Sequence, residues 1–249
     1  MKKSLLIYGT RSVIEAVRSK KSIEKVLLQE GLINDRVKEL EKVIKEHSIP
    51  FAWVPIKKIN SLTNKNHQGV VGFLTEIPTA SLQQIIDYKY SRGHTPFFLL
   101  LDRVTDVRNF GAVSRTCECA GLDGIVITDK GNAPITSDAV KTSAGALNHL
   151  PICKVKSLSM AIKLLQDNGI HIVACTEKAT KSIYSVDFTT PTAILLGSEQ
   201  DGISQQLLKE ANTVAKIPMK GNIESLNISV AAGIVIYEAL RQKEFTKAC

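Results

Sequence analysis

The sequence predicts an α/β protein in two parts, a small α/β unit followed by a larger domain built on a parallel sheet. Beyond Pro96, short apolar runs alternate with helix-like stretches, which is typical of a parallel sheet covered on both faces. Before that point, shorter strands and amphipathic helices form a separate group. Between the two groups, residues 79–96 are polar, and "KYSRGHTP" has the composition of a linker. We therefore expect domains at 1–78 and 97–249.

The first part is expected to hold two helices among short strands. Val13, Ile14 and Val17 recur at helical spacing, and the apolar residues between 33 and 44 follow one face of an amphipathic helix. Strands are predicted over EKVLLQ, FAWVPI and HQGVVGFLTEI, the last spanning 67–77.

The second part shows an alternation of apolar strands and helices. The predicted strands are 97–101, 124–128, 170–176, 192–197 and 213–217. The predicted helices are 110–120, about 137–147, 157–168, 203–211 and 226–242. This order of elements predicts βαβ units.

The composition fits a soluble globular protein, since the 249 residues are 44% hydrophobic and 22% charged. No apolar run approaches the ~20 residues of a membrane helix, so no membrane partner is expected. The apolar stretch near the N-terminus is too short for a signal peptide. The five cysteines are scattered and form no C-x-x-C pair, which argues against a disulfide framework and a metal site. We expect a cytoplasmic protein.

The positive charge is concentrated in the first part. Residues 1–95 hold 16 Lys or Arg against 9 Asp or Glu, whereas residues 96–249 hold 16 against 15. Such an excess is typical of a protein that binds a polyanion, but a solvated lysine-rich surface has the same composition. Charge alone leaves both interpretations open.

Three stretches place polar residues and glycines at the ends of predicted strands, where open α/β sheets bind ligands. They are "LDRVTDVRNFGAVSRT" (101–116), "LLGSEQDGIS" (195–204) and "IPMKGNIESLNISVAAG" (217–233). Each alone has a structural interpretation: a glycine turn, a helix cap at Ser225 or Asn227, or an ion pair of Arg115.

A dinucleotide-dependent oxidoreductase needs a glycine-rich first turn and an acid about 20 residues on. Asp123 lies near that distance, but Gly111 is the only glycine of the first stretch. The sequence therefore disfavours this class.

Taken together and in order, the three stretches resemble the motifs of the SpoU (TrmH-like) family of knotted RNA ribose methyltransferases. The matching residues are Asn109, Gly111, Ala112 and Arg115, then Gly197, Glu199 and Gly202, then Ile217, Pro218, Met219, Ser225, Leu226, Asn227 and Ser229. The first part resembles the RNA-binding domain of the family, with "IYGTRSVIEAV" near its start and "HQGVVG" near its end. The chain departs from the family at Val107, where Pro is usual, and at Arg11 and Ser12, where His-Ala is common.

The resemblance implies a fold and a cofactor. The parallel sheet would carry a deep trefoil knot in its C-terminal part, preceded by a small α/β RNA-binding domain like that of ribosomal proteins. The knot loops would hold S-adenosyl-L-methionine. The residues implied in cofactor binding are Thr176, Leu196, Gly197, Ile217, Met219, Ser225 and Leu226.

The resemblance also implies a reaction, the transfer of a methyl group to a ribose 2′-hydroxyl of RNA. Its catalytic residues would be Arg115, Asn109, Glu199 and Asn227, with Arg11 contacting an RNA phosphate. Arg115 would act as the base or as a phosphate clamp, and a guanidinium stays protonated in proteins. DNA lacks the 2′-hydroxyl and would not be a substrate.

The implied substrate is ribosomal RNA, at a guanosine of the large subunit, with transfer RNA as the nearer rival. The family works as a homodimer with its active site near the subunit contact. Apolar residues of the last predicted helix could serve the core or that contact, namely Ile228, Ala232, Val235, Ile236 and Leu240. A different class, an RNA-binding protein without catalysis, would lack Arg115 or the cofactor loops, and both are present.

Overall fold

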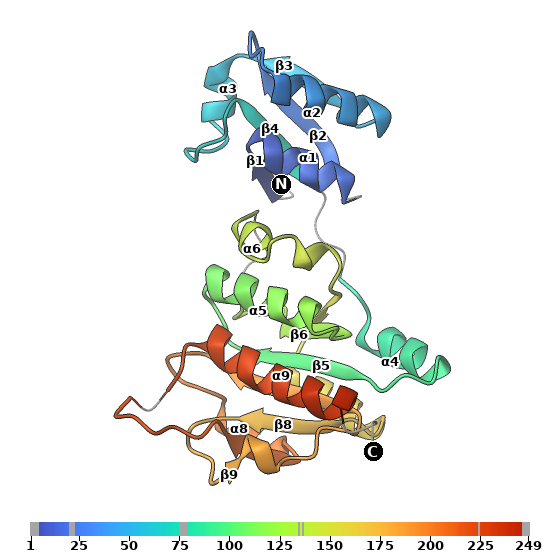
Figure 1. The fold of residues 1–249 in the computed structure, drawn as a ribbon, viewed down its shortest axis with the longest axis vertical. Helices are drawn as coiled ribbons and strands as arrows, with labels where there is room; N and C mark the ends of the chain where they lie inside the picture. The colour runs from blue at the N-terminus through green and yellow to red at the C-terminus, as the bar shows by residue number, and fades with distance from the viewer. Residues whose placement is uncertain are drawn as a thin grey trace. The chain divides into compact units, whose positions relative to one another are not determined.

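The computed structural model describes residues 5–19, 23–74, 79–133, 135, 137–223 and 225–245. The chain divides into two compact units, 1–77 and 78–249, each with its own sheet (Figure 1). The limits of the RNA-binding and catalytic domains stay predictions, and the units are described in turn.

The first unit is a four-stranded sheet with helices. Its elements are β1 (Leu5–Tyr8), α1 (Thr10–Arg18), β2 (Ile23–Gln29), α2 (Asp35–Glu46), β3 (Phe51–Val54), α3 (Ile56–Asn60) and β4 (Val70–Leu74). The strand order is β1-β4-β2-β3, with β4 antiparallel to β1 and β2, and β3 parallel to β2. The predicted helices and strands are found, whereas β1 and α3 were not predicted. The strand predicted over FAWVPI ends at Val54, and residues 67–69 precede β4 instead of belonging to it. Residues 75–77 of the predicted strand 67–77 lie outside the described residues.

The core of this unit lies between its sheet and α1 and α2. Val13 and Val17 of α1 and Leu40 and Ile44 of α2 pack into one cluster with the strands. Helix α2 begins where Asn34 Oδ1 accepts a hydrogen bond from Val37 N at 3.0 Å, an N-cap. The helical spacing seen in the sequence therefore marks the buried faces of both helices.

The second unit contains one seven-stranded sheet. Its helices are α4 (Leu82–Ser91), α5 (Val107–Cys119), α6 (Ser137–Thr142), α7 (Leu158–Asp167), α8 (Gln205–Glu210) and α9 (Ile228–Phe245). Its strands are β5 (Phe97–Asp102), β6 (Gly124–Thr128), β7 (Ile152–Val155), β8 (His171–Cys175), β9 (Lys181–Ser182), β10 (Thr192–Gly197) and β11 (Thr213–Lys216). The strand order is β7-β6-β5-β10-β8-β11-β9.

All neighbouring strands of this sheet are parallel, which confirms the predicted parallel sheet. Strands β7 and β9 were not predicted. All six residues of β5 are buried, as expected for a strand covered on both faces. Helices α4, α7 and α8 share a core with Phe98 and Leu100, while α5 and α9 pack together and against β6 and β10. The predicted trefoil knot stays a prediction from the family resemblance.

The predicted helix 137–147 is wrong in its second half. Helix α6 ends at Thr142, and a separate 3-10 turn follows at Ala146–Asn148. Ala144 and Gly145 both have positive φ, 51° and 93°, so the backbone leaves the right-handed helical conformation at these two residues.

The apolar residues of α9 were predicted to serve either the core or a subunit contact. Ile228, Ala232, Val235 and Ile236 are buried within the chain itself, and Leu240 is half-buried. Among the described side chains of α9, the large apolar ones that are exposed are instead Val230 and Tyr237, each about half exposed. Among the described residues, no helix has both the length and the apolar character that crossing a membrane requires.

The predicted linker 79–96 is wrong in its central part, where α4 forms. Leu82 and Ile86 of α4 are buried in the core that contains Phe98 and Leu100. The helix is fastened to the sheet by an ion pair between Lys89 Nζ and the carboxylate of Asp123. A short amphipathic helix in a polar context has too few apolar residues to stand out from a linker by composition.

Asp123 is a structural residue and not the ribose ligand of a dinucleotide site. Its side chain is 4% exposed, and it accepts a hydrogen bond from Phe97 N at 2.8 Å besides pairing with Lys89. We expect Asp123→Ala to lower the free energy of unfolding by about 3 kcal/mol, because two donors lose a buried partner. Urea denaturation measures this. Asp87→Ala, at an exposed position of α4, is the control and should change stability by less than about 0.5 kcal/mol. Equal effects of the two substitutions would contradict the structural role.

Candidate functional site

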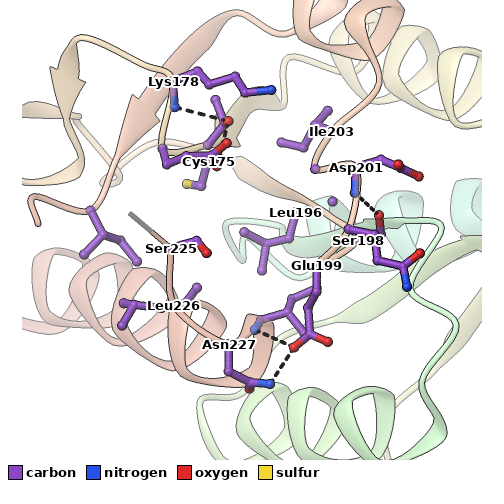
Figure 2. A pocket seen from close by; sticks show the side chains of 18 of the residues that line it. Cys175, Lys178, Leu196, Ser198, Glu199, Asp201, Ile203, Ser225, Leu226 and Asn227 are labelled. Atoms are coloured by element: carbon purple, nitrogen blue, oxygen red, sulfur yellow. Dashed lines mark hydrogen bonds between the residues drawn. The ribbon is translucent and has the colours of Figure 1, made fainter. Parts of the chain in front are cut away.

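The second unit has a cavity of about 480 Å³ at the carboxyl edge of its sheet (Figure 2). It lies where β8, β10 and β11 end and where the chain enters α9. Its lining residues are Cys175, Thr176, Glu177, Lys178, Leu196, Gly197, Ser198, Glu199, Gln200, Asp201, Gly202, Ile203, Ile217, Met219, Ser225, Leu226, Asn227, Ile228 and Ala231. Parallel strands end at the same edge, so segments far apart in sequence meet here.

All seven residues predicted to bind the cofactor line this cavity. Leu196 and Gly197 end β10, and Thr176 directly follows β8. The remaining four are Ile217 and Met219, which follow β11, and Ser225 and Leu226, which precede α9. The structure therefore brings the predicted set together, and their role in binding stays a prediction.

The shape and chemistry of the cavity fit S-adenosylmethionine. Its volume falls within the roughly 300–1,000 Å³ of ligand pockets, and Leu196, Ile217 and Leu226 give it apolar walls for an adenine. Gly197 packs directly against the main chain of Gly202 and Ile203, since a Cβ at this position would overlap it. Loop backbone at this edge can supply hydrogen-bonding groups that a nucleobase edge requires.

Cys175 contributes a neutral wall to the cavity. Burial raises the pKa of its thiol to about 12, so the thiol stays protonated at neutral pH. A protonated thiol is a poor nucleophile. Cys175 is therefore a poor candidate for a nucleophile in this cavity.

Three of the four predicted catalytic residues form one hydrogen-bonded group at the cavity. Asn227 Nδ2 donates to Glu199 Oε1 at 2.5 Å (Figure 2). It also donates to Asn109 Oδ1 at 3.2 Å. Glu199 Oε1 also accepts from Ile228 N at 3.4 Å. A side-chain amide has two N–H donors, so Asn227 can serve both partners at once. The group links the β10–α8 turn, the start of α9 and the first turn of α5.

Asn227 is also the N-cap of α9, as the structural interpretation of the third stretch proposed. Its Oδ1 accepts from Ser229 N at 2.9 Å and from Ser229 Oγ at 2.6 Å. One side chain therefore caps a helix and orients Glu199.

Two substitutions separate these roles of Asn227. We expect Asn227→Ala to lower the free energy of unfolding by about 1 kcal/mol, the usual loss on removing a cap. Asn227→Ser keeps a capping oxygen but has no amide to donate to Glu199 and Asn109, so it should stay near wild-type stability and lose activity. Thermal unfolding and a methyl-transfer assay measure the two effects. Full activity of Asn227→Ser would contradict the role of the amide.

Arg115 lies apart from this group. It is an exposed residue of α5 and is not among the described residues that line the cavity. Within the described part of the chain it has no ion-pair partner, so the ion-pair interpretation of Arg115 is not supported. Its catalytic role stays a prediction.

Gly111, in the same motif, has a packing role. A Cβ at this position would lie 2.7 Å from Thr142 Cβ and 2.8 Å from the carbonyl oxygen of Ala139. The bare glycine thus allows α6 to approach α5 closely. It helps to place the helix that carries Asn109 and Arg115, and it holds no ligand itself.

Arg11, predicted to contact RNA, is an exposed residue of α1 in the first unit. Its Nε pairs with Glu15 Oε1 at 3.2 Å, one turn further along the helix. Both side chains are well exposed, and such a pair contributes little to stability. The guanidinium is therefore accessible, and RNA contact stays a prediction.

The sequence did not single out several residues that line the cavity. Lys178, Ser198 and Asp201 are examples. Each lies between or beside predicted residues in the same loops, and this proximity was the available signal. None of the three is a matching position of the family motifs.

Comparisons with known proteins identify the family of the chain. The SpoU rRNA Methylase family matches residues 96–237, and a family described as RNA 2′-O ribose methyltransferase substrate binding matches residues 6–80. The Bacillus subtilis protein YacO, assigned to the TrmH family of tRNA/rRNA methyltransferases, is 30% identical over 95% of each chain.

Two solved structures extend the comparison. The AdoMet-bound rRNA methyltransferase of Sinorhizobium meliloti has a TM-score of 0.77 and 26% identity, over 96% of this chain and 87% of its own. The TrmH/SpoU tRNA modifying enzyme of A. aeolicus has a TM-score of 0.56 and 27% identity, over 66% of this chain and 86% of its own. The chain belongs to the SpoU rRNA Methylase family, RNA methyltransferases that use S-adenosylmethionine, as its three motifs predicted.

Proposed function

We propose that this protein methylates a ribose 2′-hydroxyl of large-subunit ribosomal RNA, at a guanosine, with S-adenosylmethionine as donor. The observation that carries the proposal is the group formed by Asn109, Glu199 and Asn227 at a cavity lined by every predicted cofactor residue. This arrangement joins a ligand cavity to polar side chains that can orient a ribose.

When bound, S-adenosylmethionine supplies a methyl group on a sulfonium, which is a strong electrophile. The protein has to hold the 2′-hydroxyl in line with that methyl and help to remove its proton. Leu196, Ile217 and Leu226 give the cavity apolar walls against which the cofactor can pack. Glu199 and Asn227, tied to each other at 2.5 Å, form a prepositioned polar edge for the ribose.

Arg115 acts in this proposal as a clamp on the neighbouring phosphate. A guanidinium stays protonated, so it is poorly suited to accept a proton but well suited to bind phosphate. Its positive charge close to the 2′-hydroxyl would also stabilise the oxyanion that develops as the proton leaves.

Ribosomal RNA is favoured as substrate by the first unit. This unit carries the excess positive charge and matches the substrate-binding family. The matched ribosomal RNA enzyme extends over 96% of the chain, whereas the matched transfer RNA enzyme covers 66%. Transfer RNA remains the rival substrate, and it is tested directly below.

We further propose a cytoplasmic homodimer. Arg115 is exposed and outside the cavity lining, and Val230 and Tyr237 of α9 expose apolar surface that the chain itself does not cover. A subunit contact on this side would bury that surface near α5, which packs against α9. A single monomeric species in light scattering at assay concentrations would refute the dimer.

The decisive experiment uses methyl-labelled S-adenosylmethionine with separate ribosomal and transfer RNA pools, followed by alkaline digestion. Alkali cannot cleave next to a 2′-O-methyl ribose, so the expected result is label in an alkali-resistant dinucleotide from ribosomal RNA. Label in transfer RNA would keep the reaction and overturn the substrate. A third outcome is that the protein binds both RNA and cofactor but labels neither pool, whether the RNA is supplied naked or as assembly intermediates. This outcome would favour an RNA-binding protein without catalysis.

RNA affinity should fall steeply with salt if phosphate contacts dominate, with a log–log slope of about −0.7 to −0.9 per contact. Arg11→Ala should make the slope shallower by about one contact. Arg36→Ala, at an exposed position of α2, is the matched control in the same unit. Filter binding over a salt series measures the slopes. A flat response of the wild type would contradict the phosphate contacts.

A further inference from the structure

Arg103 has an unusual backbone at an informative place. It directly follows β5 and has a φ of 57°, in the left-handed region that non-glycine residues seldom adopt. Such a conformation persists only where surrounding contacts hold it. The contacts of its side chain therefore indicate what the conformation achieves.

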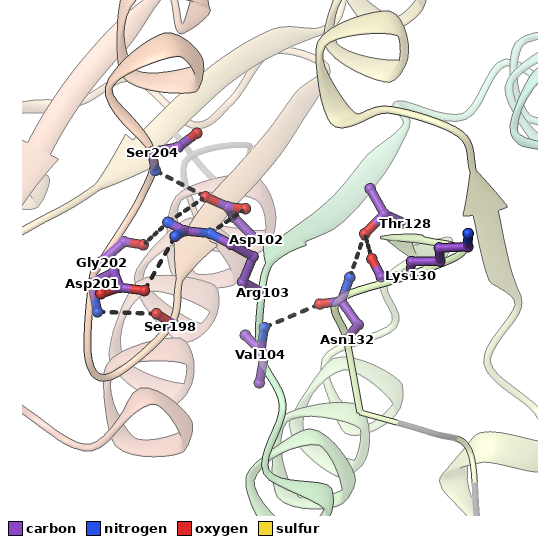
Figure 3. Close-up of polar contacts among 10 residues, drawn as sticks. All are labelled: Asp102, Arg103, Val104, Thr128, Lys130, Asn132, Ser198, Asp201, Gly202 and Ser204. Atoms are coloured by element: carbon purple, nitrogen blue, oxygen red, sulfur yellow. Dashed lines mark hydrogen bonds and ion pairs between the residues drawn. The ribbon is translucent and has the colours of Figure 1, made fainter.

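The guanidinium of Arg103 joins the end of β5 to the turn after β10 (Figure 3). Nη1 donates to Asp201 Oδ2 at 3.2 Å, and Nη2 donates to the carbonyl oxygen of Gly202 at 3.1 Å. Nε and Nη2 also donate to the two oxygens of Asp102, at 3.1 and 3.3 Å. The planar fork of arginine suits this set of acceptors, and a lysine could not reproduce it.

Asp102 anchors the arrangement from within. It is 7% exposed, and its Oδ2 also accepts from Ser204 N at 2.8 Å. The hydrogen bond to Asp102 raises the pKa of Arg103 above its usual range, so the guanidinium stays protonated. Together the two side chains grip residues 201–204 at three points.

The gripped turn is a wall of the cofactor cavity. Asp201, Gly202 and Ile203 line the cavity, and the turn is closed by Gly202 N donating to the carbonyl oxygen of Ser198 at 2.9 Å. Glu199 lies inside this closed turn. Asp102 and Arg103 are not among the described residues that line the cavity, so they act on the turn from behind it.

The residues that follow Arg103 are held as well. Val104 N donates to Asn132 Oδ1 at 3.1 Å (Figure 3). Asp106 Oδ1 accepts from Asn109 N at 2.7 Å as the cap of α5. The segment 102–106 thus connects the Glu199 turn at one end with the helix that carries Asn109 at the other.

We propose that Arg103 and Asp102 are positioning residues, a clamp that holds the turn 198–202 in the arrangement that binds S-adenosylmethionine and presents Glu199. The proposal rests on the proposed function of the cavity as the cofactor site. It assigns to the left-handed Arg103 the task of aiming a guanidinium at two acceptors of a turn 98 residues further along the chain.

The test is isothermal titration of the full-length protein with S-adenosylmethionine alone. In Arg103→Gly the backbone conformation is free of strain, but the clamp is absent. Arg103→Asn keeps a Cβ, tolerates the left-handed region and is too short to reach the turn, which controls for the flexibility of glycine. Both should weaken cofactor binding about tenfold while the melting temperature of the free protein stays within about 3 °C of wild type. Arg103→Lys should fall between them and the wild type.

Lys163→Ala removes an exposed cation from α7 and should bind the cofactor like wild type. Wild-type affinity in both Arg103→Gly and Arg103→Asn would overturn the clamp. A large fall in melting temperature in both variants, with wild-type affinity for the cofactor at temperatures where they are folded, would assign Arg103 a structural role instead. Absence of binding by the wild type itself would refute the proposed function, and the clamp with it.

Discussion

Arg115→Ala is expected to slow methyl transfer by about a thousandfold while the affinity for S-adenosylmethionine stays within about twofold of wild type. Arg115 is exposed on α5 and lines no part of the cavity among the described residues, so its loss leaves the cofactor contacts in place. What disappears is a fixed positive charge for the phosphate and for the developing oxyanion. Single-turnover kinetics with labelled cofactor and calorimetry measure the two quantities.

Arg108→Ala is the matched control for this experiment. Arg108 lies seven residues before Arg115, about two turns away on the same side of α5, and it is also exposed. If the loss of any positive charge from this face of α5 were enough to slow methyl transfer, both variants would be slowed equally. A thousandfold effect confined to Arg115 would assign it a specific role. Loss of cofactor binding together with turnover in Arg115→Ala would instead indicate a structural role.

Arg115→Lys distinguishes the two roles open to the residue. A lysine can lose its proton more readily than an arginine and could replace a base, but it lacks the planar fork that binds phosphate at two points. The clamp therefore predicts that Arg115→Lys remains strongly impaired and that its activity does not recover as pH rises. Recovery with pH would favour the base.

Gly197→Ala is expected to abolish measurable cofactor binding and to lower the free energy of unfolding by about 3 kcal/mol or more. The new Cβ would overlap the main chain of Gly202 and Ile203, and main-chain atoms cannot rotate away as a flexible side chain can. The turn that carries Glu199 would have to move away from β10, and one wall of the cavity would move with it.

Gly221→Ala supplies the control. Gly221 lies in the loop between β11 and α9, and a Cβ there would meet nothing within 4 Å. Its stability and cofactor affinity should stay near wild type. Chemical denaturation gives the stability, and binding is measured under conditions where circular dichroism shows Gly197→Ala to be folded. Wild-type affinity in folded Gly197→Ala would contradict the close backbone packing at this wall.

Local sequence patterns determined much of the second unit. The unbroken apolar runs that became β5 and β10 predicted buried parallel strands, because both faces of such strands need apolar side chains. The helical spacing before residue 50 likewise predicted α1 and α2. These predictions succeed where the pattern repeats over enough residues to be read.

Short or interrupted elements were missed for the same reason. The five residues of α3 and the two of β9 are too few to show a period. Helix α4 was taken for a linker, because its burial depends on a core and on an ion pair with Asp123, which lies in the turn before β6. The composition of residues 79–96 gives no information about that partner.

For the candidate site, the sequence by itself predicted which loops carry the site residues, because their polar residues and glycines follow buried strands in a recognisable order. Only the tertiary structure decided how these residues work together. It showed that one amide of Asn227 joins Asn109 and Glu199, that Gly111 serves packing, and that Arg103 grips the turn 198–202 from behind. Such contacts depend on the order of strands in the sheet, here β5 beside β10 beside β8. That order is set by the packing of the whole domain, and no local periodicity encodes it.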